Sequence, residues 1–336
     1  MRIAVVGATG VVGTTMLELL RARRFAADEI VPFASARSAG RQLEGGLTVR
    51  ALEPGADIEG FDLALFSAGA GISREWAPRF VAAEATVIDN SSAFRRDPDV
   101  PLVVSEVNPQ ALERHQGLIA NPNCSTMQLM VALGPIHRAV GIERIVVATY
   151  QSVSGTGKQA LDELEEQTAA MVGGGQPPAS KVYPEPIAFN VIGAAGNFLD
   201  GDDHTDEERK MMFETRKILE DDTIGVAVTC VRVPVRVSHS EAVNVQTREP
   251  LGAAGARELL RNAPGLMLEN VPTPVRAAGR DEVFVGRLRD DDSHPRAFSM
   301  WVVSDNLRKG AATNAVQIAE VLVASGLLGA GAAQRA

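Results

Sequence analysis

The chain has 336 residues, which is too long for one ordinary hydrophobic core, so we expect two domains. Hydrophobic residues make up 45% and charged residues 22%, as is typical of soluble globular proteins. The net charge of −9 argues against nucleic acid as a partner, because phosphate backbones are bound by clustered Lys and Arg. No apolar run reaches the ~18 residues of a membrane span, and "MRIAVVGATG" enters a strand pattern without signal or transit features, so we expect a cytoplasmic protein without membrane contact.

The residues that commonly ligate metals are sparse and scattered. The two cysteines, Cys124 and Cys230, form no CxxC pair, and the five histidines form no HxxH or HExxH cluster. The sequence therefore predicts no metal site.

Residues 1 to about 120 alternate short β-rich runs with helical patterns, which predicts a parallel, doubly wound sheet of the α/β class. Such sheets commonly bind nucleotides. The expected strands are Arg2–Val6, Ile30–Ala34, Leu63–Ser67, Thr86–Asp89 and Leu118–Ala120.

The segment "IAVVGATGVVG" places Gly7, Gly10 and Gly13 between the first strand and the first helix. Glycines let the backbone turn tightly and approach a pyrophosphate, whose charge then lies at the helix N-terminus. The spacing is GxxGxxG rather than GxGxxG, so the motif alone is a weak signal, and a plain strand-to-helix turn is the alternative.

The end of the second strand indicates which dinucleotide is bound. NAD sites carry a carboxylate there for the ribose 2′-hydroxyl, whereas NADP sites accommodate the 2′-phosphate with Arg. The chain reads "FASARSAG" without a carboxylate, so we predict NADP. The candidate cofactor residues of this domain are Gly7, Thr9, Gly10, Val11, Val12, Gly13, Ser35, Arg37 and Ser38.

The stretch "ANPNCSTMQLMVAL" places Cys124 where a Pro-containing turn becomes a helix. The unpaired N–H groups and dipole of a helix N-terminus favour a thiolate, the nucleophilic form of cysteine. Free cysteines are more often buried as small hydrophobes, so this motif depends on the rest of the chain for its interpretation.

Beyond Cys124, β-branched runs such as "RIVVATYQSV" and "IGVAVTCVRVPVRV" predict a second domain with a mixed or antiparallel sheet backed by helices. Gln151 is expected at a strand end, before the Gly-rich turn "SGTG". His239 is a candidate acid/base for the thiol. In a regular strand Arg232 and His239 would point to opposite faces, and Pro234 between them is the expected break.

The segment "HTDEERKMMFETRKIL" predicts a helix capped by Thr205, with Glu208 in the capping-box position. Glu207 and Lys210 share one of its faces. A run of charges of this kind, like Arg95 in "NSSAFRRD", is by itself more typical of a solvated surface. The final predicted helix, 306–330, is expected to complete a first domain of residues 1–122, which leaves 123–305 as the second domain.

These segments together resemble aspartate-semialdehyde dehydrogenases over nearly the whole chain, from "GATGVVG" through "NPNCST", "YQSVSGTG", "EERK" and "VRVPVRVSHSE" to "SDNLRKGAA". The resemblance implies a Rossmann-type first domain, a second α+β domain similar to the catalytic domain of glyceraldehyde-3-phosphate dehydrogenase, and a homodimer or homotetramer. It also implies NADP-linked, phosphate-dependent interconversion of L-aspartate 4-semialdehyde and 4-aspartyl phosphate, in the biosynthesis of lysine, diaminopimelate, threonine and methionine.

Roles for individual residues follow from the same resemblance. Cys124 would form an acyl thioester, His239 would be the acid/base, and amides near Asn123 would stabilise the carbonyl oxygen. The substrate would contact Gln151, Arg232 and Glu207, the latter two through its α-carboxylate and α-ammonium. The phosphate would contact Arg95 and Lys210, and the cofactor would also contact Ser154, Gly155 and Asn306.

Four other interpretations remain. N-acetyl-γ-glutamyl-phosphate reductases share the expected chemistry, but their cysteine turn usually reads Asn-Pro-Gly-Cys-Tyr, and an acetylated nitrogen would not favour Glu207 as a partner. A malonyl-CoA reductase-like enzyme is a minor alternative. A Cys/His thiol hydrolase would not need the glycine loop. A non-catalytic paralogue would have no need of Cys124, Gln151, Arg232 and His239.

Overall fold

The computed structural model describes residues 1–329. Two compact units are present, one formed by residues 1–123 together with the chain from Ala311, and the other by Cys124–Gly310. Each unit has its own sheet and is described separately.

The first unit contains a parallel sheet in the order β5-β2-β1-β6-β7-β8. Its strands are β1 (Arg2–Val6), β2 (Glu29–Ala34), β5 (Arg50–Ala51), β6 (Leu63–Phe66), β7 (Thr86–Asp89) and β8 (Leu118–Ala120). The predicted parallel sheet is confirmed, and its five predicted strands have boundaries within one residue, whereas β5 was not predicted. The hairpin β3 (Gln42–Leu43) with β4 (Leu47–Thr48) and the short 3-10 helices η1 (Ala36–Ser38) and η2 (Pro109–Arg114) were not predicted.

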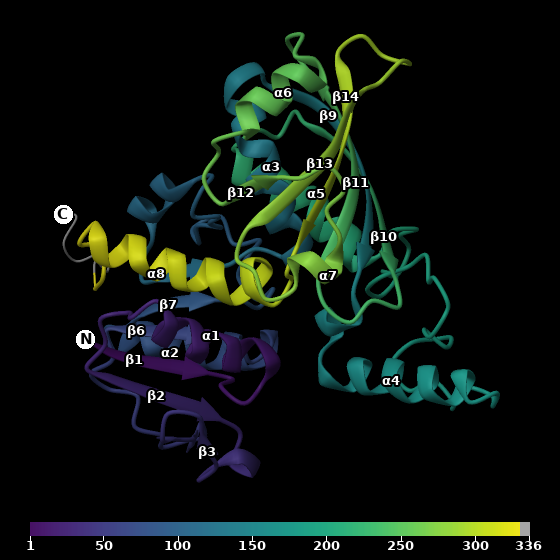
Figure 1. Cartoon of the computed structure of the whole chain (residues 1–336). Helices are drawn as coiled ribbons and strands as arrows, with labels where there is room; N and C mark the ends of the chain where they lie inside the picture. The colour runs from purple at the N-terminus through teal and green to yellow at the C-terminus, as the bar shows by residue number, and fades with distance from the viewer. Residues whose placement is uncertain (330–336) are drawn as a thin grey trace. The chain divides into compact units, whose positions relative to one another are not determined.

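Helices cover both faces of this sheet (Figure 1). Side chains alternate along a strand, so Ile3 and Val5 of β1 pack in one core with α1 (Val11–Ala22) and α8 (Asn314–Ala324). Their neighbours Ala4 and Val6 pack in a second core with α2 (Ala70–Ala82). Burial on both faces explains why these strands read as continuous apolar runs.

The second unit contains a mixed sheet in the order β10-β9-β11-β14-β13-β12. β9 pairs in parallel with β10 and antiparallel with β11, which confirms the predicted mixed sheet. The strands are β9 (Ile142–Gln151), β10 (Gly225–Arg232), β11 (His239–Thr247), β12 (Leu266–Leu268), β13 (Val283–Asp290) and β14 (Ala297–Ser304).

Helices α3 (Cys124–Val140) and α5 (Asp206–Leu219) pack against each other and against this sheet, as Figure 1 shows. A 3-10 turn, η3 (Val153–Thr156), follows β9 and leads into α4 (Lys158–Val172). Residues 248–296, for which the sequence pattern gives no prediction, supply β12, β13, α6 (Gly252–Leu260) and α7 (Pro274–Ala277).

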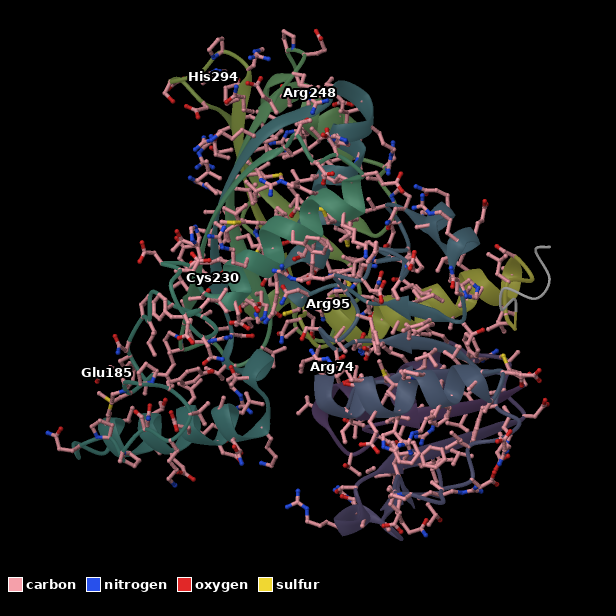
Figure 2. All side chains as sticks on the ribbon, turned by 180° about the vertical axis from the view of Figure 1, so that it is seen from behind. Arg74, Arg95, Glu185, Cys230, Arg248 and His294 are labelled. Carbon is pink, nitrogen blue, oxygen red and sulfur yellow. The ribbon has the colours of Figure 1, made fainter. Side chains whose placement is uncertain are left out.

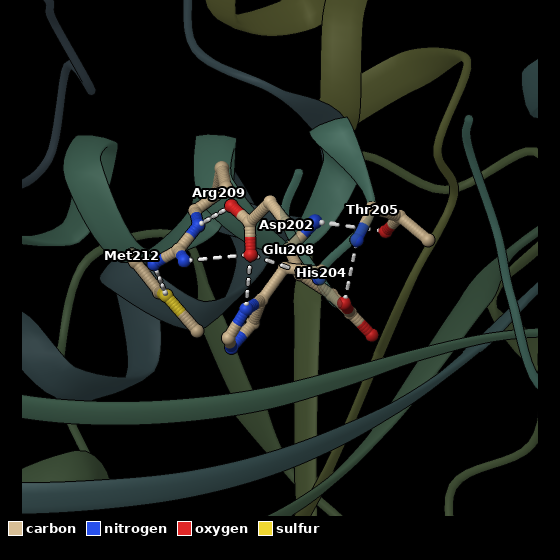
Figure 3. A network of polar contacts seen from close by, with 6 residues as sticks. All are labelled: Asp202, His204, Thr205, Glu208, Arg209 and Met212. Carbon is tan, nitrogen blue, oxygen red and sulfur yellow. Dashed lines mark hydrogen bonds and ion pairs between the residues drawn. The ribbon is translucent and has the colours of Figure 1, made fainter. Parts of the chain in front are cut away.

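The start of α5 has the predicted capping box (Figure 3). The Glu208 backbone N–H donates to Thr205 Oγ1 over 3.3 Å, and the Thr205 N–H donates to Glu208 Oε2 over 2.9 Å. Asp202 adds an ion pair with Arg209 of the first turns, 2.6 Å from Nε. These contacts fix the helix end that carries Glu207 and Lys210.

The predicted helix 306–330 is shorter and begins differently. A π-helical turn, η4 (Arg308–Thr313), precedes α8, which ends at Ala324. The Asp305 carboxylate accepts from the N–H groups of Leu307 and Arg308 at 2.8 and 3.1 Å, so the first residues form a side-chain-capped turn. Residue 330 lies outside the described residues.

Candidate active site

The glycine loop joins β1 to α1 in the first unit. Gly7 has φ of 85°, and a Cβ there would lie 2.3 Å from the Ser67 carbonyl oxygen. A Cβ on Gly13 would lie 2.2 Å from the Gly7 carbonyl oxygen. Both positions therefore require glycine. Gly10 is the N-cap of α1, with no side-chain cap and no acidic residue in the first turn, so the helix N-terminus suits a phosphate. Of the other loop residues, Thr9, Val11 and Val12 are half-buried.

The end of β2 presents the residues expected near a ribose phosphate. Ser35 is the N-cap of η1, and Ser35 and Arg37 are exposed, whereas Ser38 is half-buried. The predicted cofactor side chains of this unit thus follow β1 and β2, which are paired neighbours. A dinucleotide fits this edge, because α/β sheets bind such ligands at the carboxyl ends of their strands.

Arg95 follows β7 in the same unit (Figure 2) and is buried, contrary to the solvated surface that a charge run suggests. Its Nη2 donates to the Asn90 carbonyl oxygen over 2.7 Å. Asn123 is also buried. Arg95 and Lys210 belong to different units, so their common role at a phosphate stays a prediction.

Cys124 is the first residue of α3, which confirms its predicted position at a helix N-terminus. Cys124 is half-buried. Gly310 lies against it, since a Cβ on Gly310 would come within 3.0 Å of the Cys124 Cβ. The other cysteine, Cys230 in β10 (Figure 2), is fully buried, and burial raises the pKa of its thiol far above the ordinary range, so it is not a nucleophile.

The end of β9 brings together residues that are distant in sequence. Gln151 is paired with Arg232 of β10, and Tyr150 is paired with Ser240 of β11. Arg232 and His239 therefore flank the same end of β9 from its two sides. The expectation of one strand broken at Pro234 is only partly right, because β10 ends at Arg232 and residues 233–238 cross over β9 to begin a separate strand.

His239 is fully buried, and its orientation is set by Ser152. The Ser152 backbone N–H donates to Nδ1 over 3.0 Å, so Nδ1 accepts and the hydrogen of the neutral ring lies on Nε2. Nε2 has no hydrogen-bond partner among the described residues. Burial, with a smaller effect of the Arg232 charge, lowers the pKa of His239 to about 3. The ring is neutral at physiological pH and presents an N–H group.

A polar network around Ser152 contains site residues that sequence reasoning missed. Ser152 Oγ lies 3.1 Å from His239 Nδ1 and 3.1 Å from the Asn306 side-chain oxygen, which also accepts from the Ser238 N–H at 2.8 Å. The Asn306 amide nitrogen donates to Ser154 Oγ over 2.9 Å. The only sequence signal for Ser152 is its place between Gln151 and Ser154.

Arg232 is a buried cation, only 7% exposed. Its Nη1 donates to the Ser152 carbonyl oxygen over 2.7 Å, and its Nε has no partner. Within the described chain no carboxylate lies at ion-pair distance from it. A Cβ on Gly155 would lie 3.5 Å from Arg232 Nη1 and 3.2 Å from His239 Nε2, so Gly155 lies against both groups and adds no side chain beside them. A buried guanidinium with unused donors is suited to an anionic ligand.

Glu207 and Lys210 adjoin this group from α5. The Gln151 amide donates to Glu207 Oε1 over 3.4 Å, and Lys210 Nζ lies 3.3 Å from Glu207 and 2.7 Å from Asp206. Burial opposes the charge of Lys210, but the Glu207 and Asp206 carboxylates raise its pKa, so it stays a cation. Glu208 is occupied by the cap and by the Cys230 N–H, at 3.0 Å, which leaves Glu207 as the carboxylate at the site.

A cavity of about 330 Å³ lies elsewhere in the second unit, along α4. It is lined by Asp162, Glu163, Glu166 and residues near Lys181, and by none of the predicted site residues. The convergence of His239, Arg232 and Gln151 therefore locates the candidate site better than this cavity does.

Residues 1–329 contain no group of three His, Cys, Asp or Glu side chains arranged to hold a metal ion. None of the helices in this range is long and apolar enough to span a membrane.

Two models of known protein families match this chain and define its class. Residues 2–115 match the model of the semialdehyde dehydrogenase NAD-binding domain, and residues 133–309 match that of the semialdehyde dehydrogenase dimerisation domain. The predicted fold class is thereby confirmed: a Rossmann-like α/β domain and a second α+β domain. Fold and matches define an oxidoreductase with a nicotinamide-binding domain.

Individual relatives narrow the class. An aspartate-semialdehyde dehydrogenase of Aquifex aeolicus is 51% identical over 97% of this chain and 99% of its own length. The crystal structure of aspartate semialdehyde dehydrogenase II from Vibrio cholerae, complexed with ASA, matches with a TM-score of 0.92 at 50% identity, over 96% of this chain and 98% of that one. The NADP-bound enzyme of Candida albicans matches with a TM-score of 0.75 at 25% identity, over 97% of this chain and 99% of that one. The chain belongs to the aspartate-semialdehyde dehydrogenase family.

The buried, neutral His239 has a consequence for stability. Its folded-state pKa lies below the ordinary 6.5, so the unfolded chain binds a proton that the folded chain does not between about pH 6.5 and pH 3. Stability should fall as the pH drops through this window. We expect wild type to lose about 2 kcal/mol more than His239→Gln between pH 7.5 and pH 5.

Urea unfolding at the two pH values measures this difference. His294→Gln, which removes a loop histidine, is the control and should behave like wild type. Equal losses in wild type and His239→Gln would show that His239 is not held neutral.

Proposed function

We propose that the protein is an NADP-dependent, phosphorylating aspartate-semialdehyde dehydrogenase that acts through a thioester on Cys124. The observation that carries the proposal is the buried guanidinium of Arg232, without a carboxylate partner in the described chain, beside the unpartnered Nε2 of His239. An anionic amino-acid substrate satisfies the first group, and a carbonyl oxygen satisfies the second. The Vibrio cholerae relative complexed with ASA supports this substrate class.

The substrate contacts follow from charge and hydrogen bonding. The forked donors of Arg232 suit the planar α-carboxylate, and Glu207 suits the α-ammonium group. Gln151 donates to Glu207 and is paired with Arg232 in the sheet, so it would orient Glu207 beside Arg232.

The chemistry at Cys124 is covalent. In the oxidative direction the thiolate sulfur adds to the aldehyde carbon, and loss of a hydride from that carbon leaves a thioester. A phosphate oxygen then attacks the acyl carbon, forms 4-aspartyl phosphate and releases the thiolate. The reverse sequence reduces aspartyl phosphate to the semialdehyde. Charge grows on the carbonyl oxygen at each addition, and the Asn123 region and the α3 N-terminus would stabilise it.

His239 is the acid/base of this scheme. Its Nε2–H donates to the oxygen of the thiol adduct when that oxygen is negative. Acceptance of a proton at Nε2 requires the ring hydrogen on Nδ1, where Ser152 Oγ, at 3.1 Å, is the available acceptor. This tautomer would exchange the contact between the Ser152 N–H group and Nδ1 for one between Nδ1–H and Ser152 Oγ.

The cofactor residues are those of the glycine loop and of the β2 end. The N–H groups of Val11 and Val12 at the start of α1 would bind the pyrophosphate, with Thr9 beside it, and Ser35, Arg37 and Ser38 would bind the 2′-phosphate. Bound NADP would accept the hydride of the oxidation. In the second unit, Ser154, Gly155 and Asn306 would contact it. The Candida albicans relative with NADP supports this choice of cofactor.

The phosphate would bind Lys210 and Arg95. The assembly is proposed to be a homodimer or homotetramer, in agreement with the match to a dimerisation domain. We place the reaction in the cytoplasm, in the biosynthesis of lysine, diaminopimelate, threonine and methionine.

The direct test is an assay of the purified protein with aspartate semialdehyde, NADP and phosphate, followed by the absorbance of NADPH. We expect turnover that requires phosphate and is faster with NADP than with NAD. Thiol-ester hydrolysis without NADP binding would favour a hydrolase and overturn the proposal.

Cys124→Ala should abolish turnover and leave NADP affinity nearly unchanged, because the nucleophile and the glycine loop lie in different segments. Cys230→Ala is the matched control and should retain turnover, since that thiol is buried and inert. Steady-state kinetics and cofactor titration give both values. Near wild-type activity of Cys124→Ala would exclude the thioester route.

Arg37→Ala should weaken the affinity for NADP more than that for NAD, because only NADP carries the 2′-phosphate. Arg41→Ala, an exposed arginine further along the same segment, is the control and should change neither affinity. Fluorescence titration with each cofactor provides the comparison. An equal loss for NADP and NAD in Arg37→Ala would assign Arg37 a general electrostatic role.

The two anion sites should respond to different substitutions. Lys210→Ala should raise the KM for phosphate much more than the KM for semialdehyde. Arg232→Lys should do the reverse, because an ammonium cannot reproduce a forked contact; a lost charge-assisted hydrogen bond costs about 1.5–3 kcal/mol, or roughly 10-fold to 150-fold in kcat/KM. Kinetics with each substrate varied in turn test this. Proportional losses for both ligands in both variants would indicate one mixed pocket.

A further inference from the structure

Tyr183 lies in the segment between α4 and α5 and contacts two parts of the candidate site. The Arg232 guanidinium lies 5.8 Å from the centroid of its ring. Its hydroxyl group donates to Thr156 Oγ1 over 2.9 Å. Thr156 ends η3, the turn that contains Ser154 and Gly155. One side chain therefore touches both the proposed carboxylate-binding residue and the proposed cofactor-binding turn.

Packing holds the Tyr183 ring in place. The residue is half-buried and lies against a small apolar core formed by η3, α4 and the segment between α4 and α5. This core contains Val153, Leu164 and Ile187. Burial raises the pKa of the Tyr183 hydroxyl, so that group is a donor at neutral pH.

The Tyr183 ring can orient the Arg232 guanidinium without occupying its hydrogen-bond donors. An arginine that must bind a substrate carboxylate needs a fixed plane, but a protein carboxylate beside it would occupy its donors and cancel its charge. The negative face of an aromatic ring attracts the guanidinium without using an N–H group. Within the described residues the Arg232 guanidinium makes one hydrogen bond, to the Ser152 carbonyl oxygen, and the ring of Tyr183 supplies a second restraint.

We infer that Tyr183 is a positioning residue with two separable functions: its ring orients Arg232 for the substrate carboxylate, and its hydroxyl group fixes η3 for the cofactor. The inference rests on the proposed function, because it takes Arg232 and η3 in those roles. Tyr183 would thereby couple the position of the substrate-binding Arg232 to that of the cofactor-binding turn η3.

Three substitutions separate the two functions. Tyr183→Leu removes the ring and the hydroxyl group, Tyr183→Phe removes only the hydroxyl group, and Thr156→Val removes the acceptor. We expect Tyr183→Leu to raise the KM for aspartate semialdehyde about 2-fold to 30-fold, with a smaller change in kcat. Tyr183→Phe should restore that KM to near the wild-type value.

The hydroxyl function is read from cofactor binding. Tyr183→Phe and Thr156→Val should each raise the Kd for NADP by the same factor, about 2-fold to 12-fold. The double variant should be no weaker than either single variant, because both remove the same hydrogen bond. A general loss of structure would not give this pattern, in which Tyr183→Phe has a near wild-type KM for semialdehyde but a raised Kd for NADP.

Arg232→Lys is measured in parallel to distinguish two failures. If it raises the KM for semialdehyde while Tyr183→Leu does not, the inference about Tyr183 is wrong and the proposed function stands. If Arg232→Lys itself leaves that KM unchanged, the role of Arg232 in the proposed function is wrong, and the inference fails with it. Additive losses in Tyr183→Phe combined with Thr156→Val would overturn the hydroxyl function.

Discussion

The main chain of Ser152 is the constraint on which the catalytic half of the structure depends. Its N–H group fixes His239 and its carbonyl oxygen fixes Arg232, at 3.0 and 2.7 Å. Strand pairing makes this possible, because β10 and β11 flank β9 where it ends. The candidate acid/base and the candidate carboxylate-binding residue are thus held by the N–H and C=O groups of one buried residue just after the end of β9. Neither side chain therefore has to be ordered when substrate binds.

Local signals in the sequence predicted local structure well. Buried parallel strands gave continuous apolar runs, and the capping box at Thr205 and Glu208 needs only residues three apart. Prediction failed where pairing across the chain decides the structure. β13 shifts register against β14 between Gly286 and Arg289, which interrupts the alternation of its side chains, and β12 pairs only with β13.

The site shows the same division between local and long-range information. The position of Cys124 at a helix N-terminus was predictable because adjacent residues determine both the turn and the start of the helix. Ser238 was not, although it donates to Asn306, because it adopts φ of 79° at a residue that is not glycine. Tyr183 and Ser152 were missed for a related reason: their roles are defined by contacts with Arg232, which only the folded sheet brings near them.

The central claim is that Cys124 carries the acyl group, and a pre-steady-state experiment tests it most directly. Enzyme mixed rapidly with aspartate semialdehyde and NADP, in the absence of phosphate, should release a burst of about one NADPH per subunit and then nearly stop, because the thioester has no acceptor. Addition of phosphate should restore turnover. Absence of a burst, with NADPH formed only when phosphate is present from the start, would contradict the covalent route.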